Sequence, residues 1–155
     1  MAAKKKAVDI DNSTIAKRTG YTDTLQKIQM EGFCPFCEKN LAKHHAKPIL
    51  IQGAHWLVTK NNWPYKGSRH HFLLISRTHV EKIEELTAVM WTELQKHIQT
   101  LTRQYKCKGG TLMLRSGDTT ITGATVTHLH AHFIVGAPRT DGSTEIRAVI
   151  GFEKK

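Results

Sequence analysis

Three histidines alternate with apolar residues at positions 128, 130 and 132. Successive side chains of a β-strand point to opposite faces, so His128, His130 and His132 are expected to share one face while the residues between them face a core. Next-but-one residues lie roughly 6.5 to 7 Å apart, so more than one ring can contact the same ligand. Imidazoles serve as nucleophiles, general acids and metal ligands. The alternative is an edge strand with a histidine-rich polar face, but the strict alternation beside an apolar run favours a functional site.

A second chemical feature is the pair Cys34 and Cys37, which flank Pro35-Phe36. With Cys107 there are three cysteines, which do not form an even disulfide framework. Two thiolates separated by two residues suit tetrahedral Zn²⁺, provided that two further ligands come from elsewhere. A pair of packed thiols in a turn is the alternative. Cys107 stands alone and is interpreted as a free thiol.

Two helices are predicted from spacing and stop signals. Apolar residues recur every three or four positions over residues 87–105, and Gly109 and Gly110 follow as helix terminators. A shorter helix begins after Thr22 or Asp23 and stops at Gly32. The cysteine pair therefore lies in a turn just beyond this shorter helix.

Apolar or alternating runs bounded by polar residues and turn formers predict the strands. These runs cover residues 49–52, 55–60, 72–75, 112–115, 126–135 and 145–152. Strands outnumber helices and several links are short. We therefore expect an α+β fold, a largely antiparallel sheet of about five strands with one long helix packed on it.

The length and composition indicate one domain. A chain of 155 residues with 39% hydrophobic residues can form one compact core, which we assign to residues 21–155. Residues 1–20 carry Lys4, Lys5, Lys6, Lys17 and Arg18 and are expected to form a basic, disordered arm. No apolar stretch approaches the roughly 20 residues of a membrane span, and the N-terminus lacks the apolar core of a secretory signal. The expected location is cytoplasmic, without membrane contact.

The formal net charge of +10 favours partners that carry phosphate. This sign fits nucleotides, RNA and DNA alike. A solubilising tail is the favoured interpretation of the basic arm, because short basic runs are common, and no DNA-binding module is recognised. A nucleotide is therefore the favoured partner, and nucleic acid is a less favoured one.

Residues 128–134 resemble the signature of the histidine triad (HIT) family, in which three histidines alternate with apolar residues and further apolar residues follow. The resemblance extends to the cysteine pair, to residues 61–65 with Pro64, and to residues 76–79, in the order that family members show. It covers roughly residues 21–136.

The resemblance implies a mechanism in which the middle histidine, His130, attacks the α-phosphorus of a nucleotide and forms a covalent nucleotidyl-histidine. It implies that His132 contacts the phosphate or the leaving group, and that the hydroxyl of Thr125 bonds a phosphate oxygen. Backbone amides around Gly123 are expected to hold other oxygens. The implied substrates are dinucleoside polyphosphates or nucleoside phosphoramidates.

For the rest of the nucleotide, the resemblance implies that Asn61 contacts the ribose hydroxyls and that Trp63 forms a wall for the base. A purely structural role for Trp63 is the alternative. Of His70 and His71, which open a strand, one is expected to face the nucleotide, whereas the adjacent His44 and His45 are expected to be solvated.

Relatives with the cysteine pair complete a zinc site with two histidines, and the matching residues here are His79 and His128. The implied site is thus Cys34, Cys37, His79 and His128, with a structural Zn²⁺ that ties the cysteine turn to the catalytic strand. The resemblance also implies a homodimer.

One position departs from the family pattern. Many members carry glutamine before the hydroxyl residue, whereas this chain has Ala124. The loop at residues 117–123 is also longer than in the smallest members. Two alternatives to a nucleotide hydrolase or transferase follow: a nucleotide-binding or interaction protein with little catalysis, and an enzyme that removes adenylate from nucleic acid ends.

Overall fold

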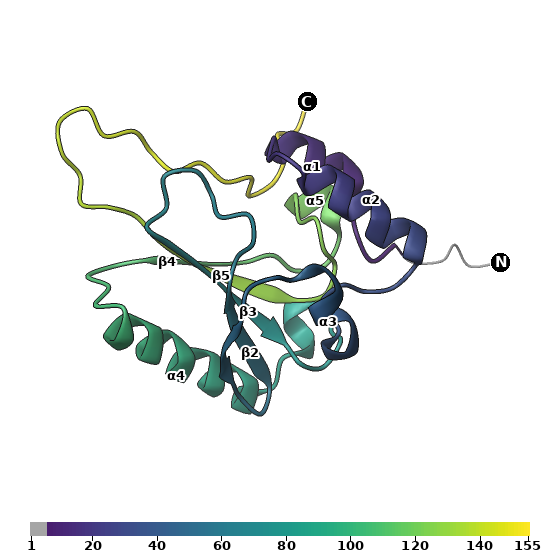
Figure 1. Ribbon diagram of the computed structural model, residues 1–155, viewed down its shortest axis with the longest axis horizontal. Helices are drawn as coiled ribbons and strands as arrows, with labels where there is room; N and C mark the ends of the chain where they lie inside the picture. The colour runs from purple at the N-terminus through teal and green to yellow at the C-terminus, as the bar shows by residue number, and fades with distance from the viewer. Residues whose placement is uncertain (1–5) are drawn as a thin grey trace.

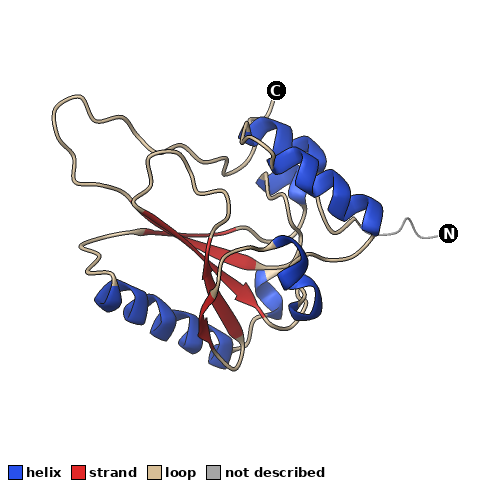
Figure 2. Cartoon of the chain, viewed as in Figure 1, coloured by secondary structure: helices blue, strands red, loops and turns tan. Residues whose placement is uncertain are grey.

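One five-stranded sheet, in the order β1-β2-β3-β5-β4, organises the fold. The computed structural model describes residues 6–155, and Figures 1 and 2 show the sheet crossing the middle of the molecule. Every neighbouring pair is antiparallel. This confirms the expected α+β fold. The strands are β1 (Ile49–Gln52), β2 (Trp56–Lys60), β3 (His70–Ser76), β4 (Thr111–Leu114) and β5 (His130–Val135).

The long helix α4 (Ala88–Gln104) covers one face of the sheet (Figure 1). The Thr87 side chain caps its first turn, and the helix ends at Tyr105, before the predicted terminators. The main core lies between α4 and the sheet, and each large apolar side chain buried there contributes roughly 1.5 to 3 kcal/mol. Its buried members are Trp56, Val58, Phe72, Leu74, Met90, Leu94, Leu101, Ala131, Phe133 and Val135.

The pairing of β3 with β5 determines which side chains face away from α4. Ala131 and Phe133 belong to the α4 core, so the alternation of β5 directs His130 and His132 to the opposite face. Their partners in β3 are Ile75 and Leu73, and both belong to a second apolar cluster on that opposite face. The two histidines therefore project from a part of the sheet that has apolar clusters on both faces.

Short helices gather on this second face (Figure 2): α1 (Ile10–Ala16), α2 (Tyr21–Glu31), α3 (Glu38–His44) and α5 (Thr119–Thr122), while η1 (Ile83–Glu85) precedes α4. Helix α2 starts after Gly20 and stops at Gly32, whose φ of 70° suits glycine. A small core of Val8, Tyr21, Leu25, Ile28 and Val126 joins α2 to the segment before β5.

The expected basic arm at residues 1–20 differs from the structure where the structure describes it. Lys4 and Lys5 lie outside the described residues, but Ile10–Ala16 is helical. The Asn12 side chain is buried and donates to the carbonyls of Thr119 and Ala124 at 2.8 and 2.7 Å. Apolar contacts and the Asn12 amide therefore order this segment. The charge pattern of the sequence gave no sign of these contacts.

Two strand predictions were wrong. Residues 145–152 contain no strand, because only Ile146 and Val149 are partly buried, and the Val149 carbonyl bonds the Arg115 side chain instead of a neighbouring strand. The segment after β5 instead loops back toward α1 and α5 (Figure 1). The predicted strand 126–135 pairs regularly only from His130, since Val126 forms an isolated bridge to Val8. No helix among the described residues is long and apolar enough to cross a membrane.

Candidate active site and metal centre

The three histidines of the triad are buried, but they do not all point into one space. The rings of His130 and His132 lie 4.9 Å apart. His128 lies at a bend two residues before β5, and its Nδ1 points toward the cysteines, 3.4 Å from the Cys34 sulfur. The expectation that all three share one strand face is therefore wrong for His128, because the regular strand begins after it.

His130 is held in one tautomer. Its Nδ1 lies 2.8 Å from the His128 carbonyl oxygen, which only accepts, so Nδ1 carries the hydrogen and Nε2 keeps its lone pair. Burial lowers the pKa of His130 to about 4, which leaves the ring neutral near pH 7. The ring packs edge-on against Phe36 with centroids 4.8 Å apart. A neutral imidazole with an oriented lone pair can attack an electrophilic phosphorus.

A second chain of contacts orients His132. Its Nδ1 lies 2.8 Å from His71 Nε2. Two groups that only donate approach the His71 ring, the Tyr65 backbone N–H at Nδ1 (3.1 Å) and the Asn61 Nδ2 at Nε2 (3.2 Å). Burial lowers the pKa of His71 to about 3 and also lowers the pKa of His132. Both rings are therefore neutral near pH 7, and one hydrogen lies between them.

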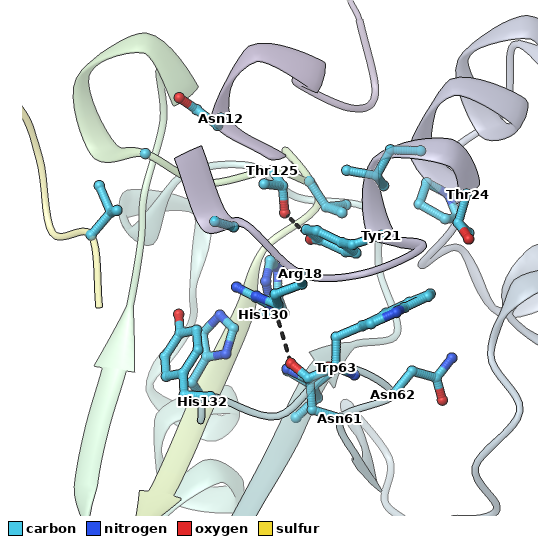
Figure 3. A pocket seen from close by; sticks show the side chains of 18 of the residues that line it. Asn12, Arg18, Tyr21, Thr24, Asn61, Asn62, Trp63, Thr125, His130 and His132 are labelled. Atoms are coloured by element: carbon cyan, nitrogen blue, oxygen red, sulfur yellow. Dashed lines mark hydrogen bonds between the residues drawn. The ribbon is translucent and has the colours of Figure 1, made fainter. Parts of the chain in front are cut away.

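A cavity of about 550 Å³ opens beside His130 and His132, a size typical of small-molecule sites. Figure 3 shows the labelled side chains around it. The walls come from α1, α2, the loop after β2, the segment before β5 and the C-terminal segment. All of the residues predicted for catalysis or nucleotide binding line it, namely Asn61, Trp63, Gly123, Thr125, His130 and His132.

Asn61 and Trp63 form one side of this cavity. The Asn61 Oδ1 accepts from the Trp63 backbone N–H at 2.9 Å, and its Nδ2 lies 3.2 Å from His71 Nε2. The Trp63 ring packs against Tyr21 with centroids 5.0 Å apart. Trp63 thus both lines the cavity and packs against the N-terminal helices, which combines the two roles considered for it.

Thr125 and Gly123 form the opposite side. The Thr125 hydroxyl hydrogen-bonds the Tyr21 hydroxyl, as the dashed line in Figure 3 shows. Gly123 ends α5 with a φ of 72°, and a Cβ there would lie 2.5 Å from Val149 Cγ1. Between them, Ala124 is buried at 5% exposure and offers only a methyl group. The side-chain contact of the family glutamine is therefore absent at this position.

Two arginines that the sequence reasoning did not select line the same cavity. The Arg18 guanidinium stacks on the rings of Tyr21 and Tyr65, 4.8 and 4.9 Å from their centroids. The Arg115 Nη1 lies 3.4 Å from His132 Nε2, and its Nη2 donates to the Tyr65 hydroxyl at 3.2 Å. Arg115 directly follows the apolar run of β4, and this position at a strand end could have marked it as a candidate site residue. For Arg18, the sequence offered no indication of a site beyond its positive charge.

A separate cluster of Cys34, Cys37, His79 and His128 has its ligand atoms within 4.8 Å of one another. The sulfur-to-Nδ1 distances of 3.3, 3.4 and 3.8 Å compare with the roughly 3.3 to 3.8 Å that tetrahedral bonds of 2.0 to 2.3 Å require. The outer nitrogens are oriented as well: His128 Nε2 donates to the Ser76 carbonyl at 2.6 Å, and His79 Nε2 lies 3.3 Å from a Glu81 carboxylate oxygen. The donor set and its orientation can hold a metal ion.

The remaining histidines differ in their surroundings. His44 and His45 are half-buried and belong to the cavity lining, with His45 Nε2 2.7 Å from the Thr59 hydroxyl, so the expectation that they are solvated was wrong. They end a short helix that packs against the sheet, which adjacency in sequence did not reveal. The His70 ring packs edge-on against Tyr105 and is not part of the cavity lining.

This chain is similar to known proteins in both sequence and fold. The family model described as HIT domain matches residues 43–139. No curated protein matches the chain. Among solved structures, "HIT family hydrolase from Clostridium thermocellum Cth-393" is 21% identical with a TM-score of 0.53 and covers 70% of this chain and 93% of that one.

Two further structures share the fold. A "hypothetical histidine triad nucleotide-binding protein ST2152" from Sulfolobus tokodaii is 21% identical with a TM-score of 0.55, covering 78% of this chain and 82% of that one. A "ZN-bound histidine triad family protein" from Mycobacterium smegmatis is 16% identical with a TM-score of 0.51, covering 70% and 78%. Because the family model matches more than half of the chain and contains the triad, this protein belongs to the HIT-domain family.

Proposed function

We propose that this protein is a nucleotide hydrolase or nucleotidyltransferase that acts on the α-phosphate of dinucleoside polyphosphates or nucleoside phosphoramidates. The observation that carries the proposal is the neutral His130 ring, whose Nδ1 is bonded to the His128 carbonyl so that Nε2 keeps its lone pair beside the 550 Å³ cavity. The HIT-domain match and the hydrolase named among the structural relatives agree with it.

The reaction proceeds in two steps. His130 Nε2 attacks the α-phosphorus, the bond from phosphorus to the leaving group breaks, and the leaving atom keeps the electron pair. His132 lies on the leaving-group side. A polyphosphate leaves as its anion, whereas the nitrogen of a phosphoramidate takes up a proton as it leaves, and this proton passes through His132. Water then attacks phosphorus, the P–N bond to His130 breaks with its electrons returning to the ring, and the proton of water passes to solvent or replaces the one that His132 delivered. An acceptor hydroxyl in place of water gives transfer instead of hydrolysis.

The phosphate and nucleoside ends are bound by opposite walls. The Thr125 hydroxyl and the amides around Gly123 bind non-bridging oxygens, while Asn61 binds the ribose and Trp63 packs on the base. Asn62 Oδ1 supports a bound nucleoside, because it is buried without a hydrogen-bond partner among the described residues, and a ligand N–H or O–H would satisfy it.

Zinc at Cys34, Cys37, His79 and His128 has a structural role in this proposal, and the matched ligand spacing supports it. When bound, the ion holds the cysteine turn against the segment that precedes β5. The chemistry itself belongs to His130 and its neighbours. We also propose a homodimer, for which light scattering of the purified protein is the direct measurement.

The test is mass spectrometry of protein quenched during turnover of diadenosine tetraphosphate and adenosine phosphoramidate. The expected result is adenylate attached to His130. The variant His130→Ala is expected to lose turnover by at least about a thousandfold while still binding nucleotide. The variant His55→Ala, a half-buried histidine outside the cavity, is the matched control. Turnover retained by His130→Ala would overturn the role of this residue.

A second candidate function is nucleotide binding with little catalysis, and Ala124 favours it because the family glutamine contact is missing. Tight nucleotide binding with neither adduct nor turnover would support it. Adenylated DNA belongs in the same assay, since a salt-sensitive preference for it would favour the removal of adenylate from nucleic acid ends.

A further inference from the structure

The charge of the cavity exceeds what one α-phosphate needs. Its lining residues include four cationic side chains, Lys17, Arg18, Arg115 and Arg147, and no aspartate or glutamate. Arg147 is paired with Glu145, which lies outside the lining. Neither Arg18 nor Arg115 pairs with a carboxylate among residues 6–155. Half-buried guanidinium groups without counter-charges raise the local concentration of anions and favour ligands with several negative charges.

The contact between Arg115 and His132 indicates where one such anionic oxygen belongs. Arg115 Nη1 has only donor hydrogens, and it lies 3.4 Å from His132 Nε2, at the long end of the hydrogen-bond range. This guanidinium edge therefore points at the ring that lies on the leaving-group side of His130. A phosphate oxygen bound at this point would accept a charge-assisted hydrogen bond from Arg115.

Arg18 can complete this site. A guanidinium has five N–H donors, and the hydrogen bond found for Arg18 is the one from Nη1 to the Trp63 carbonyl, at 3.0 Å. Stacking on Tyr21 and Tyr65 holds the group in place and leaves its remaining edges for a ligand. In Figure 3 the Arg18 side chain extends toward the part of the cavity that contains His130 and His132.

We propose that Arg18, Arg115 and His132 form a binding site for a second phosphate, on the leaving-group side of the α-phosphate. The substrate class is then a nucleotide with a phosphoanhydride chain, such as a dinucleoside polyphosphate, in preference to a phosphoramidate with an uncharged leaving group. This inference rests on the proposed function and makes its substrate more specific. Arg18 lies outside the matched HIT domain, so this chain adds to the domain a contact of its own.

The test is calorimetric titration of AMP and ATP into His130→Ala protein, where the ligands stay intact. We expect ATP to bind at least tenfold more tightly than AMP. Adding Arg18→Gln or Arg115→Gln should reduce this ratio at least tenfold or to near one, and Arg115→Lys should restore part of it. Arg139→Gln removes the same charge from an exposed residue outside the cavity and should leave the ratio unchanged.

The ratio separates ligand recognition from folding, because a variant that folds poorly loses affinity for both nucleotides. Equal affinity for AMP and ATP in the parent, or a ratio unaffected by both arginine variants, would overturn the second-phosphate site even if the unmodified protein forms the His130 adduct. An arginine-dependent preference for ATP without adduct or turnover would support this site and overturn the proposed catalysis. Binding of neither nucleotide would overturn both.

Discussion

Removal of the metal should lower the stability of the protein, because its four ligands come from segments far apart in the sequence. Cys34 and His128 are 94 residues apart, and Cys37 and His79 are 42 apart. An ion bound by the unfolded chain would have to close loops of these lengths, at about 4 to 5 kcal/mol each in the entropy model of cross-links, so zinc should bind the folded protein by preference. A metal that binds only the folded state stabilises it by about 4.1 kcal/mol at a thousandfold its dissociation constant. At that concentration we therefore expect zinc to contribute about 4 kcal/mol.

For a chain of this length, 1 kcal/mol shifts Tm by roughly 2 to 4 °C, so chelation should lower Tm by about 8 to 16 °C. Scanning calorimetry of zinc-loaded and chelator-treated protein measures the shift, and elemental analysis measures the zinc. Cys37→Ser should lose most of the zinc-dependent shift. Cys107→Ser, at the edge of the α4 core, should keep it. A loaded and a chelated protein with the same Tm, or a purified protein without stoichiometric zinc, would refute the assignment.

Three further predictions concern the buried histidines and one glycine. The folded-state pKa values of His71 and His130, about 3 and 4, lie below the unfolded value near 6.5. The unfolded chain therefore takes up protons first, and denaturant titrations should show the free energy of unfolding falling between pH 6.5 and 4, by at most about 2.7 kcal/mol per pH unit from these two groups; a constant value would contradict the burial argument. His71→Phe should reduce kcat about 10- to 100-fold while changing nucleotide affinity less than about threefold, because His132 loses the hydrogen-bond partner that orients its ring; an unchanged kcat would contradict this role. Gly123→Ala should lower both stability, by about 1 to 2 kcal/mol, and kcat/KM, because its φ is positive and its Cβ would meet Val149; thermal unfolding and turnover, with the unhindered Gly109→Ala as control, measure the difference, and equal effects would count against it.

The parts of the fold that the sequence predicted well are those with a strong local period. The helix at residues 87–105 and the pair His130 and His132 repeat at the spacing of their element, so the face that each side chain occupies follows directly from the sequence. The cysteine pair and the triad were also predicted as sites, and the structure brings Cys34, Cys37, His79 and His128 together. That prediction came through the family resemblance, because no spacing rule connects His79 with the cysteines.

Other features depended on contacts between distant segments. Residues 145–152 alternate like a strand, yet the Val149 carbonyl bonds a side chain of β4. The orientation of His132 depends on its contact with His71, whose ring is held by the Tyr65 backbone N–H. A periodic pattern describes one element at a time, so neither contact could be predicted from it.

The cavity is lined by residues from inside and from outside the matched domain. The histidine triad motif therefore indicates the type of reaction better than it indicates the substrate. His130, the proposed nucleophile, and His132 lie within residues 43–139, the part matched by the HIT domain. Arg18, Tyr21 and Val149 lie outside it and still line the same cavity. Under the proposed mechanism, the attacking group therefore belongs to the matched domain, whereas the flanking segments contribute to the charge and shape offered to the leaving group. For this chain the flanks add positive charge, and its preference among phosphorylated leaving groups should follow from Arg18 at least as much as from the triad.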